Sequence, residues 1–136
     1  MSKMRGKLFH NYMVEKTSWL LAALGWFICL EFCIRRNGVT NFVDIFAVLN
    51  GVQIAFEIET TSRHIADNCY KAQAVGIPIC IIVPTTKVYN AAVKKTCDIH
   101  IDHAGLPIRI FTLHQLEQEL TDYLSLFIAA NSHTDK

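Results

Sequence analysis

Phe42-Val43-Asp44-Ile45-Phe46, the dipeptide Asn50-Gly51 and Ala55-Phe56-Glu57-Ile58-Glu59-Thr60 together decide the fold of this chain. Asn-Gly between two runs of β-forming apolar residues is a strong short-range signal for a tight β-hairpin. With residue 50 opposite residue 51, residue i lies opposite residue 101 − i. The hairpin therefore predicts that Asp44 faces Glu57 directly.

The carboxylates of this hairpin are the strongest chemical signal in the sequence. Two carboxylates opposed across a hairpin repel each other unless a cation or a shared proton lies between them. Glu57 and Glu59 are two residues apart and share one face of their strand. Oxygen-rich sites of this kind suit Mg²⁺ or Mn²⁺. The alternative is that Asp44, Glu57 and Glu59 only line a solvated face of the sheet.

The pattern on either side of the hairpin predicts an α/β fold. We expect helices over 10–24, 64–75, 86–96 and 112–129, strands over 26–34, 41–49, 52–59, 79–83 and 98–101, and a further short strand over 108–111. The order α-β-β-β-α-β-α-β-α corresponds to a mixed central sheet flanked by helices. We expect residues 1–9 to be an N-terminal extension, 10–130 a single domain, and 131–136 a flexible tail.

Composition narrows the class of protein. The 136 residues are 51% hydrophobic and 18% charged, which excludes a disordered chain. The net charge of +1 shows no overall basic excess, but three carboxylates at 44–62 lie between two basic stretches. Five cysteines without a paired spacing favour a reducing compartment. The longest apolar run, 19–30, is too short to span a membrane, so we expect a cytoplasmic protein without a membrane partner.

The order of these elements resembles the PD-(D/E)xK nuclease superfamily. A helix is followed by a three-stranded meander and another helix, with Asp on the second strand and Glu-x-Glu at the end of the third. This resemblance to the restriction-endonuclease-like fold covers roughly residues 10–101. The resemblance implies that Asp44 and Glu57 bind Mg²⁺. The stretch Glu57-Ile58-Glu59-Thr60 is similar to small nuclease-like proteins of mobile elements that carry E-x-E-T.

The sequence departs from that family at two positions. Val43 replaces the usual Pro, and Glu59 stands where the family has its Lys. His64, Asn68 and Lys71 fall at i, i+4 and i+7 on the following helix, and some family members carry the essential Lys there. Lys71 is thus the candidate replacement and Glu59 a third acidic ligand. The alternative is a polar stripe that simply faces water.

The resemblance also implies supporting residues and a substrate. In this superfamily a Glu on the first helix can support the metal through water, which makes Glu15 a candidate, and His10 on the same helix is a weaker one. The expected activity is Mg²⁺-dependent hydrolysis of DNA phosphodiester bonds. Contacts to the nucleic-acid backbone are assigned to basic side chains outside the carboxylate cluster: Arg35, Arg36, Lys87, Lys94 and Lys95.

Three other interpretations stay open. The protein could be a nuclease-fold module that has lost catalysis and binds nucleic acid or a protein partner. The run Cys97–His103 could form a zinc site, although it lacks paired cysteines. The chain could also form a homodimer or larger complex, which would select the target. The last helix carries an apolar stripe that either forms the interface of such a complex or packs on the body of the domain: Leu116, Leu120, Tyr123, Leu124 and Phe127. We favour packing on the domain. Cys29 and Cys33 are interpreted as core or edge residues rather than a redox pair.

Overall fold

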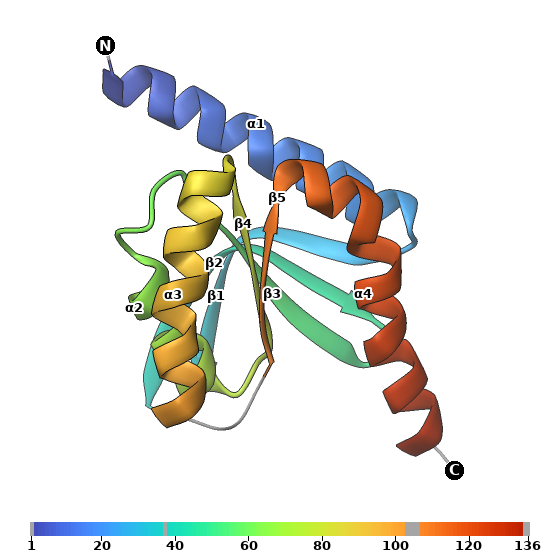
Figure 1. The fold of residues 1–136 in the computed structure, drawn as a ribbon. Helices are drawn as coiled ribbons and strands as arrows, with labels where there is room; N and C mark the ends of the chain where they lie inside the picture. Colours follow the sequence, from blue (N-terminus) through green and yellow to red (C-terminus); the bar gives the residue numbers. More distant parts are fainter. Residues whose placement is uncertain (1, 37, 103–106, 135–136) are drawn as a thin grey trace.

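The computed structural model describes residues 2–36, 38–102 and 107–134. It is a five-stranded mixed sheet with helices packed on both faces (Figure 1). The elements along the chain are α1 (Ser2–Ala23), β1 (Phe27–Arg36), β2 (Val39–Leu49), β3 (Val52–Ile58), α2 (Ile65–Val75), β4 (Ile79–Val83), α3 (Thr86–Asp102), β5 (Ile108–Thr112) and α4 (Leu113–Thr134). The predicted α/β class, with a mixed sheet flanked by helices, is confirmed, but the last strand in the predicted order lies at Ile108–Thr112 and not at 98–101.

The strands follow one another in space in the order β1-β2-β3-β4-β5. The first three strands are antiparallel, as predicted for a meander, and β3, β4 and β5 run parallel. β3 therefore has an antiparallel neighbour on one side and a parallel neighbour on the other. Every residue of β4 is buried, which confirms the prediction that this apolar strand is covered on both faces.

The turn at Asn50-Gly51 fixes the register of the central hairpin. Both residues have positive φ angles, 52° and 83°, as a two-residue hairpin turn of this type requires. Ile45 pairs with Phe56, and the pairing continues to Leu49 with Val52. The predicted rule that residue i lies opposite 101 − i is therefore confirmed.

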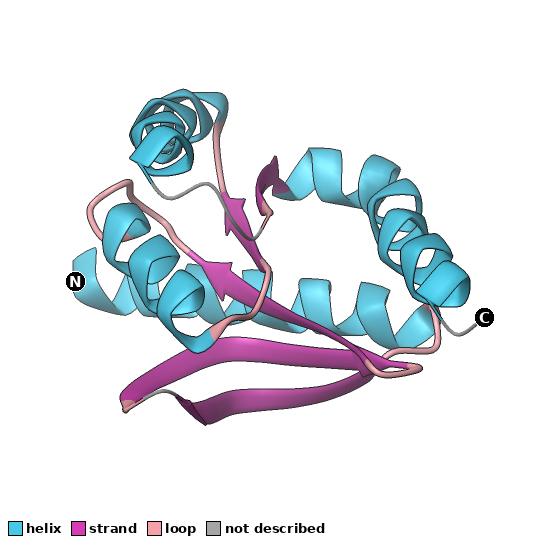
Figure 2. Ribbon diagram, turned by 90° about the horizontal axis from the view of Figure 1, so that it is seen from below, coloured by secondary structure: helices cyan, strands magenta, loops and turns pink. Residues whose placement is uncertain are grey.

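Helices lie on both faces of the sheet (Figure 2), and a hydrophobic layer on each face holds them to it. One face packs against α1 and α4 through side chains that include Phe56, Ile58 and Ile82. The other face packs against α2 and α3 through Ile79 and Ile81, among others. Alternate residues of the same strands serve the two layers, as the period of two along a strand requires.

The helix at each end of the chain is longer than predicted. α1 begins at Ser2 rather than at residue 10, and α4 continues to Thr134 rather than ending near residue 129. Residues 6–9 are exposed and carry no buried stripe, so the pattern used to detect helices is missing there. Helix-forming residues such as Lys7 and Leu8 extend a helix that is already anchored further along. The predicted extension at 1–9 and tail at 131–136 are thus largely helical.

The predicted strand over 98–101 is wrong, because α3 continues to Asp102. Ala92, Thr96 and Ile99 are buried at helical spacing, and this period outweighs the short alternation that suggested a strand. The fifth strand is β5, where the sequence predicted only a further short strand.

The apolar stripe of α4 packs on the domain, as favoured. Leu116, Leu120, Tyr123 and Leu124 are buried in the layer shared with α1, and Phe127 packs against it. None of the helices in the described part of the chain is both long and apolar enough to span a bilayer.

Candidate active site

The central feature of the site is a fork where β2 and β3 separate. Their ladder ends at the pair Ile45 and Phe56, and Asp44 and Glu57 are the residues that follow this last pair on the two strands. The backbone N–H of Asp44 donates to Oε1 of Glu57 at 2.9 Å, and the backbone N–H of Ile58 donates to Oδ2 of Asp44 at 2.8 Å. The two carboxylates thus replace the backbone ladder at this point, and the predicted juxtaposition of Asp44 and Glu57 is present.

The neighbouring strand β1 is distorted at the same level. β1 pairs with β2 on both sides of Asp44, through Leu30 with Ile45 and Phe32 with Val43. Glu31, which falls between these pairs, has a φ of 49°, an uncommon angle for a residue with a side chain. Glu31 therefore lies opposite Asp44 on the side away from Glu57, at the point where β2 leaves β3.

Burial dominates the electrostatics of Glu57. Its side chain is buried, with 7% of the residue exposed. Burial, and next the nearby charge of Asp44, raise the pKa of Glu57 to about 8, against the hydrogen bond from the Asp44 backbone, which lowers it. The carboxyl of Glu57 is therefore mostly protonated at neutral pH when no cation lies beside it.

Glu59 is held by the following helix. The side-chain amide of Asn68 on α2 donates a short hydrogen bond to Oε1 of Glu59, and the backbone N–H of Glu59 donates to the carbonyl of Ile82 at 2.9 Å. Burial raises the pKa of Glu59, and the hydrogen bond from Asn68 opposes that shift. The predicted association of Asn68 with the carboxylate cluster is thus present as a direct contact.

His64 and Lys71 flank the carboxylates without contacting them. Both residues are exposed, and the described residues show no ion pair from either side chain to Asp44, Glu57 or Glu59. Their charges still act at the site: Lys71 lowers the pKa of Glu57, and His64 lowers that of Glu59. The polar stripe of α2 therefore divides into one contacting residue, Asn68, and two neighbours that act through their charge.

α1 approaches the fork from the opposite face of the sheet. Nε2 of His10 lies 3.4 Å from Oδ2 of Asp44. The hydrogen bond to Asp44 raises the pKa of His10, although burial opposes the shift. A pocket of about 520 Å³ opens here between α1 and β1, and its lining includes His10, Glu15, Glu31 and Asp44. Glu15 thus lies where a supporting acid was predicted, in the same pocket as Asp44.

The carboxylates at the fork fit a divalent cation as a pair, but not as a group of three. Within the described residues, no three His, Cys, Asp or Glu side chains converge closely enough to hold a metal ion. The predicted ligands Asp44, Glu57 and Glu59 therefore do not form a three-residue metal cluster. Glu59 accepts a hydrogen bond from Asn68 instead. Mg²⁺ is often held by only one or two carboxylates, with water and substrate phosphate completing its shell. The opposed pair Asp44 and Glu57 fits that mode.

The basic residues predicted to contact nucleic acid lie in two separate places. Arg36 donates from its guanidinium to the side chain of Gln53 at 2.9 Å, at the end of β3 opposite to Glu57. Arg35 precedes it on β1, so the structure does not bring these two arginines to the fork. On α3, Lys95 donates to the carbonyl of Ser62 at 2.6 Å, in the loop that follows Glu59. Lys87 and Lys94 are exposed on the same helix.

Two residues at the fork did not stand out from the sequence pattern. His10, predicted only as a weaker supporting residue, contacts Asp44. Glu31 was not among the predicted site residues. Arg36 pairs with Val39, so residue i lies opposite 75 − i along the first hairpin. The same arithmetic that found Glu57 would have placed Glu31 opposite Asp44.

The competing cysteine and zinc assignments receive no support. Residues 97–102 belong to α3, so the strand alternation that would have gathered Asp98, His100 and Asp102 does not apply, and His103 lies outside the described residues. All five cysteines are free, with Cys29 and Cys33 half-buried on β1.

Comparisons with known proteins provide no relative from which a function could be transferred. No protein-family model matches the chain, and no curated protein shows a significant match. The case for a function therefore rests on the geometry of the fork.

Proposed function

We propose that the chain is a Mg²⁺-dependent nuclease-like protein that hydrolyses DNA phosphodiester bonds, with a restriction-endonuclease-like fold. One observation carries the proposal: Asp44 and Glu57 face each other at the end of β3, each anchored by a backbone N–H. Such an arrangement leaves two like charges close together in a partly buried place. The pair of carboxylates is stable when a proton or a cation lies between them. The cation-bound state could support hydrolysis of a phosphodiester bond.

Asp44 and Glu57 would hold the divalent cation, Mg²⁺ or Mn²⁺. A bound cation of this kind polarises the phosphate and lowers the pKa of an attacking water. The backbone hydrogen bonds fix one oxygen of each carboxylate, so both side chains are oriented before substrate arrives. Glu57 would lose its proton when the cation binds, because ligating carboxylates must be deprotonated.

The helix α2 supplies the remaining groups. Lys71 would stabilise the charge that builds up on the phosphate oxygens, in place of the lysine that the family carries at the position of Glu59. Asn68 would act as a positioning residue, since it fixes Glu59 beside the fork. On the other face, His10 would orient Asp44, and Glu15 lies in the same pocket as a supporting acid.

The DNA backbone would run past α3 and the loop after β3. Lys95 is tied to that loop through Ser62, and Lys94 and Lys87 extend the basic surface along the helix. Contacts of this kind position a duplex or a single strand without reading its sequence. The free cysteines favour a reducing compartment, and we place the activity in the cytoplasm.

The direct test is a cleavage assay over single-stranded, duplex and branched DNA with Mg²⁺ or Mn²⁺. Asp44→Asn keeps an oxygen that can accept the Ile58 N–H but removes the charge, so it should fold and lose cleavage by at least about 100-fold. Asp67→Asn, an exposed carboxylate in the first turn of α2, is the matched control and should cleave normally. Cleavage by Asp44→Asn at the normal rate would contradict the assignment of Asp44 to the active site.

A second candidate function is a nuclease-fold module that binds a partner and does not cleave. The observation that favours it is that Asp44 and Glu57 already have a structural use, because they close the fork with reciprocal hydrogen bonds. The position usually held by the lysine is also occupied by Glu59, which Asn68 engages. A module of this kind would bind DNA or a second copy of the chain without any requirement for divalent cations.

A further inference from the structure

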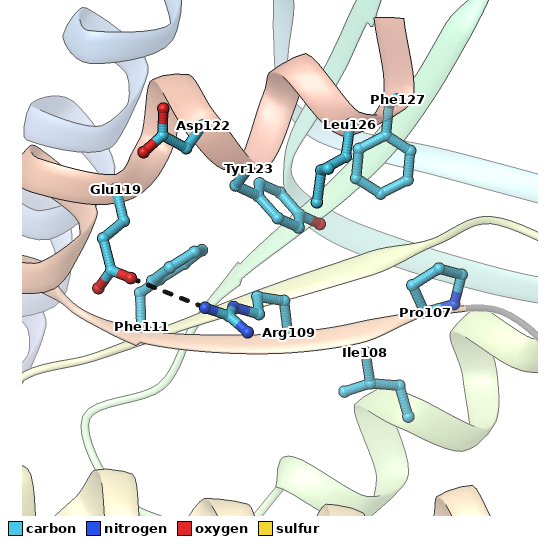
Figure 3. Close-up of a pocket in the computed structure, with 9 residues that line it drawn as sticks. All are labelled: Pro107, Ile108, Arg109, Phe111, Glu119, Asp122, Tyr123, Leu126 and Phe127. Carbon is cyan, nitrogen blue, oxygen red and sulfur yellow. Dashed lines mark ion pairs between the residues drawn. The ribbon is translucent and has the colours of Figure 1, made fainter. Parts of the chain in front are cut away.

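A second pocket, of about 600 Å³, lies between β5 and α4 (Figure 3). It shares no lining residue with the pocket at Asp44. Its volume falls in the range of pockets that hold small organic molecules. The proposed nuclease activity gives it no role.

The hydroxyl of Tyr123 is buried at this pocket. Only 7% of the residue is exposed, and its hydroxyl has no hydrogen-bond partner among the residues that the structure describes. Figure 3 shows the hydroxyl directed from α4 into the space above β5. Buried polar groups are nearly always hydrogen-bonded, so an unpaired one in a pocket points to a missing partner. Burial raises the pKa of Tyr123, so the hydroxyl keeps its proton and can donate or accept.

The walls of the pocket suit a planar ring. Phe111 and Phe127 contact Tyr123 edge-to-face, with ring centroids 5.4 Å and 5.2 Å away. The planar guanidinium of Arg109 lies over the ring of Phe111, 5.0 Å from its centroid. Aromatic and guanidinium surfaces of this kind favour flat aromatic ligands over flexible chains.

The charges at the rim suit a cation. Arg109 pairs with Glu119, with 3.8 Å between Nη2 and Oε1. Asp122 also lines the pocket, is exposed, and has no ion pair within the described residues. One carboxylate is therefore left uncompensated, which disfavours an anionic ligand and favours a positively charged one.

We propose that the pocket between β5 and α4 binds a small aromatic molecule that carries a positive charge. The ring lies among Phe111, Tyr123 and Phe127, a polar atom on the ring bonds the Tyr123 hydroxyl, and the cation lies near Asp122. This binding is independent of the carboxylates at the fork.

Three probes that share one ring and differ in charge test the proposal: tryptamine, indole and indole-3-acetate. Each is titrated into the full chain, and binding is followed through the amide signals of β5 and α4 by NMR. Tryptamine should bind saturably and about tenfold more tightly than indole, with indole-3-acetate the weakest. Equal binding of the three, tighter binding of the acetate, or no saturable shift with any of them would overturn the proposal.

Two variants assign the contacts. Tyr123→Phe removes only the hydroxyl and keeps the ring packing, so it should fold and bind tryptamine about fivefold more weakly. Asp122→Asn should reduce the preference for tryptamine over indole and leave indole binding unchanged. Tyr12→Phe, which alters an exposed tyrosine on α1, and Asp44→Asn are controls and should bind normally. Unchanged tryptamine binding in both Tyr123→Phe and Asp122→Asn would contradict the assignment.

Discussion

At the scale of single residues, the fork depends on the hydrogen bonds and the electrostatic repulsion of two neighbouring carboxylates. Asp44 and Glu57 exchange hydrogen bonds with the backbone, so neither side chain can turn away without leaving a buried N–H unpaired. Glu57 responds to burial and to its neighbour by holding its proton. The same pair that would bind a cation is therefore a source of pH-dependent stability when the cation is absent.

The pH dependence has a definite sign. The pKa of Glu57 is about 8 in the folded chain against an ordinary value of 4.5. Between these pH values the folded state binds a proton that the unfolded state has lost, so the free energy of unfolding falls as the pH rises. Without divalent cations, the contribution of Glu57 should be complete below pH 4.5 and lost as the pH rises through 8. Denaturant unfolding across this range measures the slope.

Glu57→Gln is the matched variant for that experiment. Its side chain keeps the size of protonated glutamate and an oxygen that can accept the Asp44 N–H, but it cannot ionise. The variant should lose this part of the pH dependence and be more stable than the natural chain above pH 8 by a few kcal/mol. Asp67→Asn, at an exposed position on α2, should leave the slope unchanged. An identical slope in Glu57→Gln and the natural chain would show that Glu57 is not the group that titrates.

At the scale of elements, two helices approach the fork from opposite faces of the sheet. α1 brings His10 to Asp44, and α2 brings Asn68 to Glu59. The polar spacing on α2 could be read from the sequence because the helix period is regular and Gly76 ends it in a left-handed conformation. The contribution of α1 was less visible, since the distance between His10 and the hairpin along the chain gives no hint of contact.

Lys71 tests the role of α2. Because its side chain is exposed and makes no described ion pair, Lys71→Gln should change the stability by less than about 0.5 kcal/mol. Cleavage should fall by about 100-fold if its charge stabilises the phosphate oxygens. Lys7→Gln, an equally exposed lysine on α1, is the control and should cleave at the normal rate. Normal cleavage by Lys71→Gln would remove the proposed replacement for the missing family lysine.

Turns decided how much of the sheet could be predicted. Asn50-Gly51 fixed the register of the second hairpin, and with it the position of Asp44 opposite Glu57. The register of the first hairpin, in which Arg36 pairs with Val39, places Glu31 opposite Asp44 by the same arithmetic. The end of α3 was missed because four residues of alternation resemble a strand and equally the last turn of a helix.

At the scale of the whole molecule, the candidate site lies where two kinds of sheet meet. β3 lies between β2, to which it is antiparallel, and β4, to which it is parallel (Figure 1). The pairing of β2 with β3 ends at Ile45 and Phe56, directly before Asp44 and Glu57. In sheets with parallel strands, ligands bind outside the carboxyl ends of the strands, where neighbouring elements diverge. Glu57 and Glu59 lie at that end of β3. Both glutamates therefore lie at the end of the strand where such sheets bind their ligands.

The class and order of the elements followed from the sequence, whereas the site followed only in part. Local patterns predicted both the hairpin and the stripe of α2. Long-range packing determined which other side chains reach the fork: His10 does, and Arg36, which bonds Gln53 at the far end of β3, does not. The distribution of charge along the sequence did not indicate this separation, because Arg35 and Arg36 lie only nine and eight residues before Asp44.

The most direct test of the central claim is calorimetric titration of Mn²⁺ and Mg²⁺ into the natural chain and into Glu57→Gln. The fork predicts one saturable site in the natural chain, proton release on binding near neutral pH, and loss of binding in the variant. Binding that is absent from the natural chain, or undiminished in Glu57→Gln, would contradict a metal site at Asp44 and Glu57.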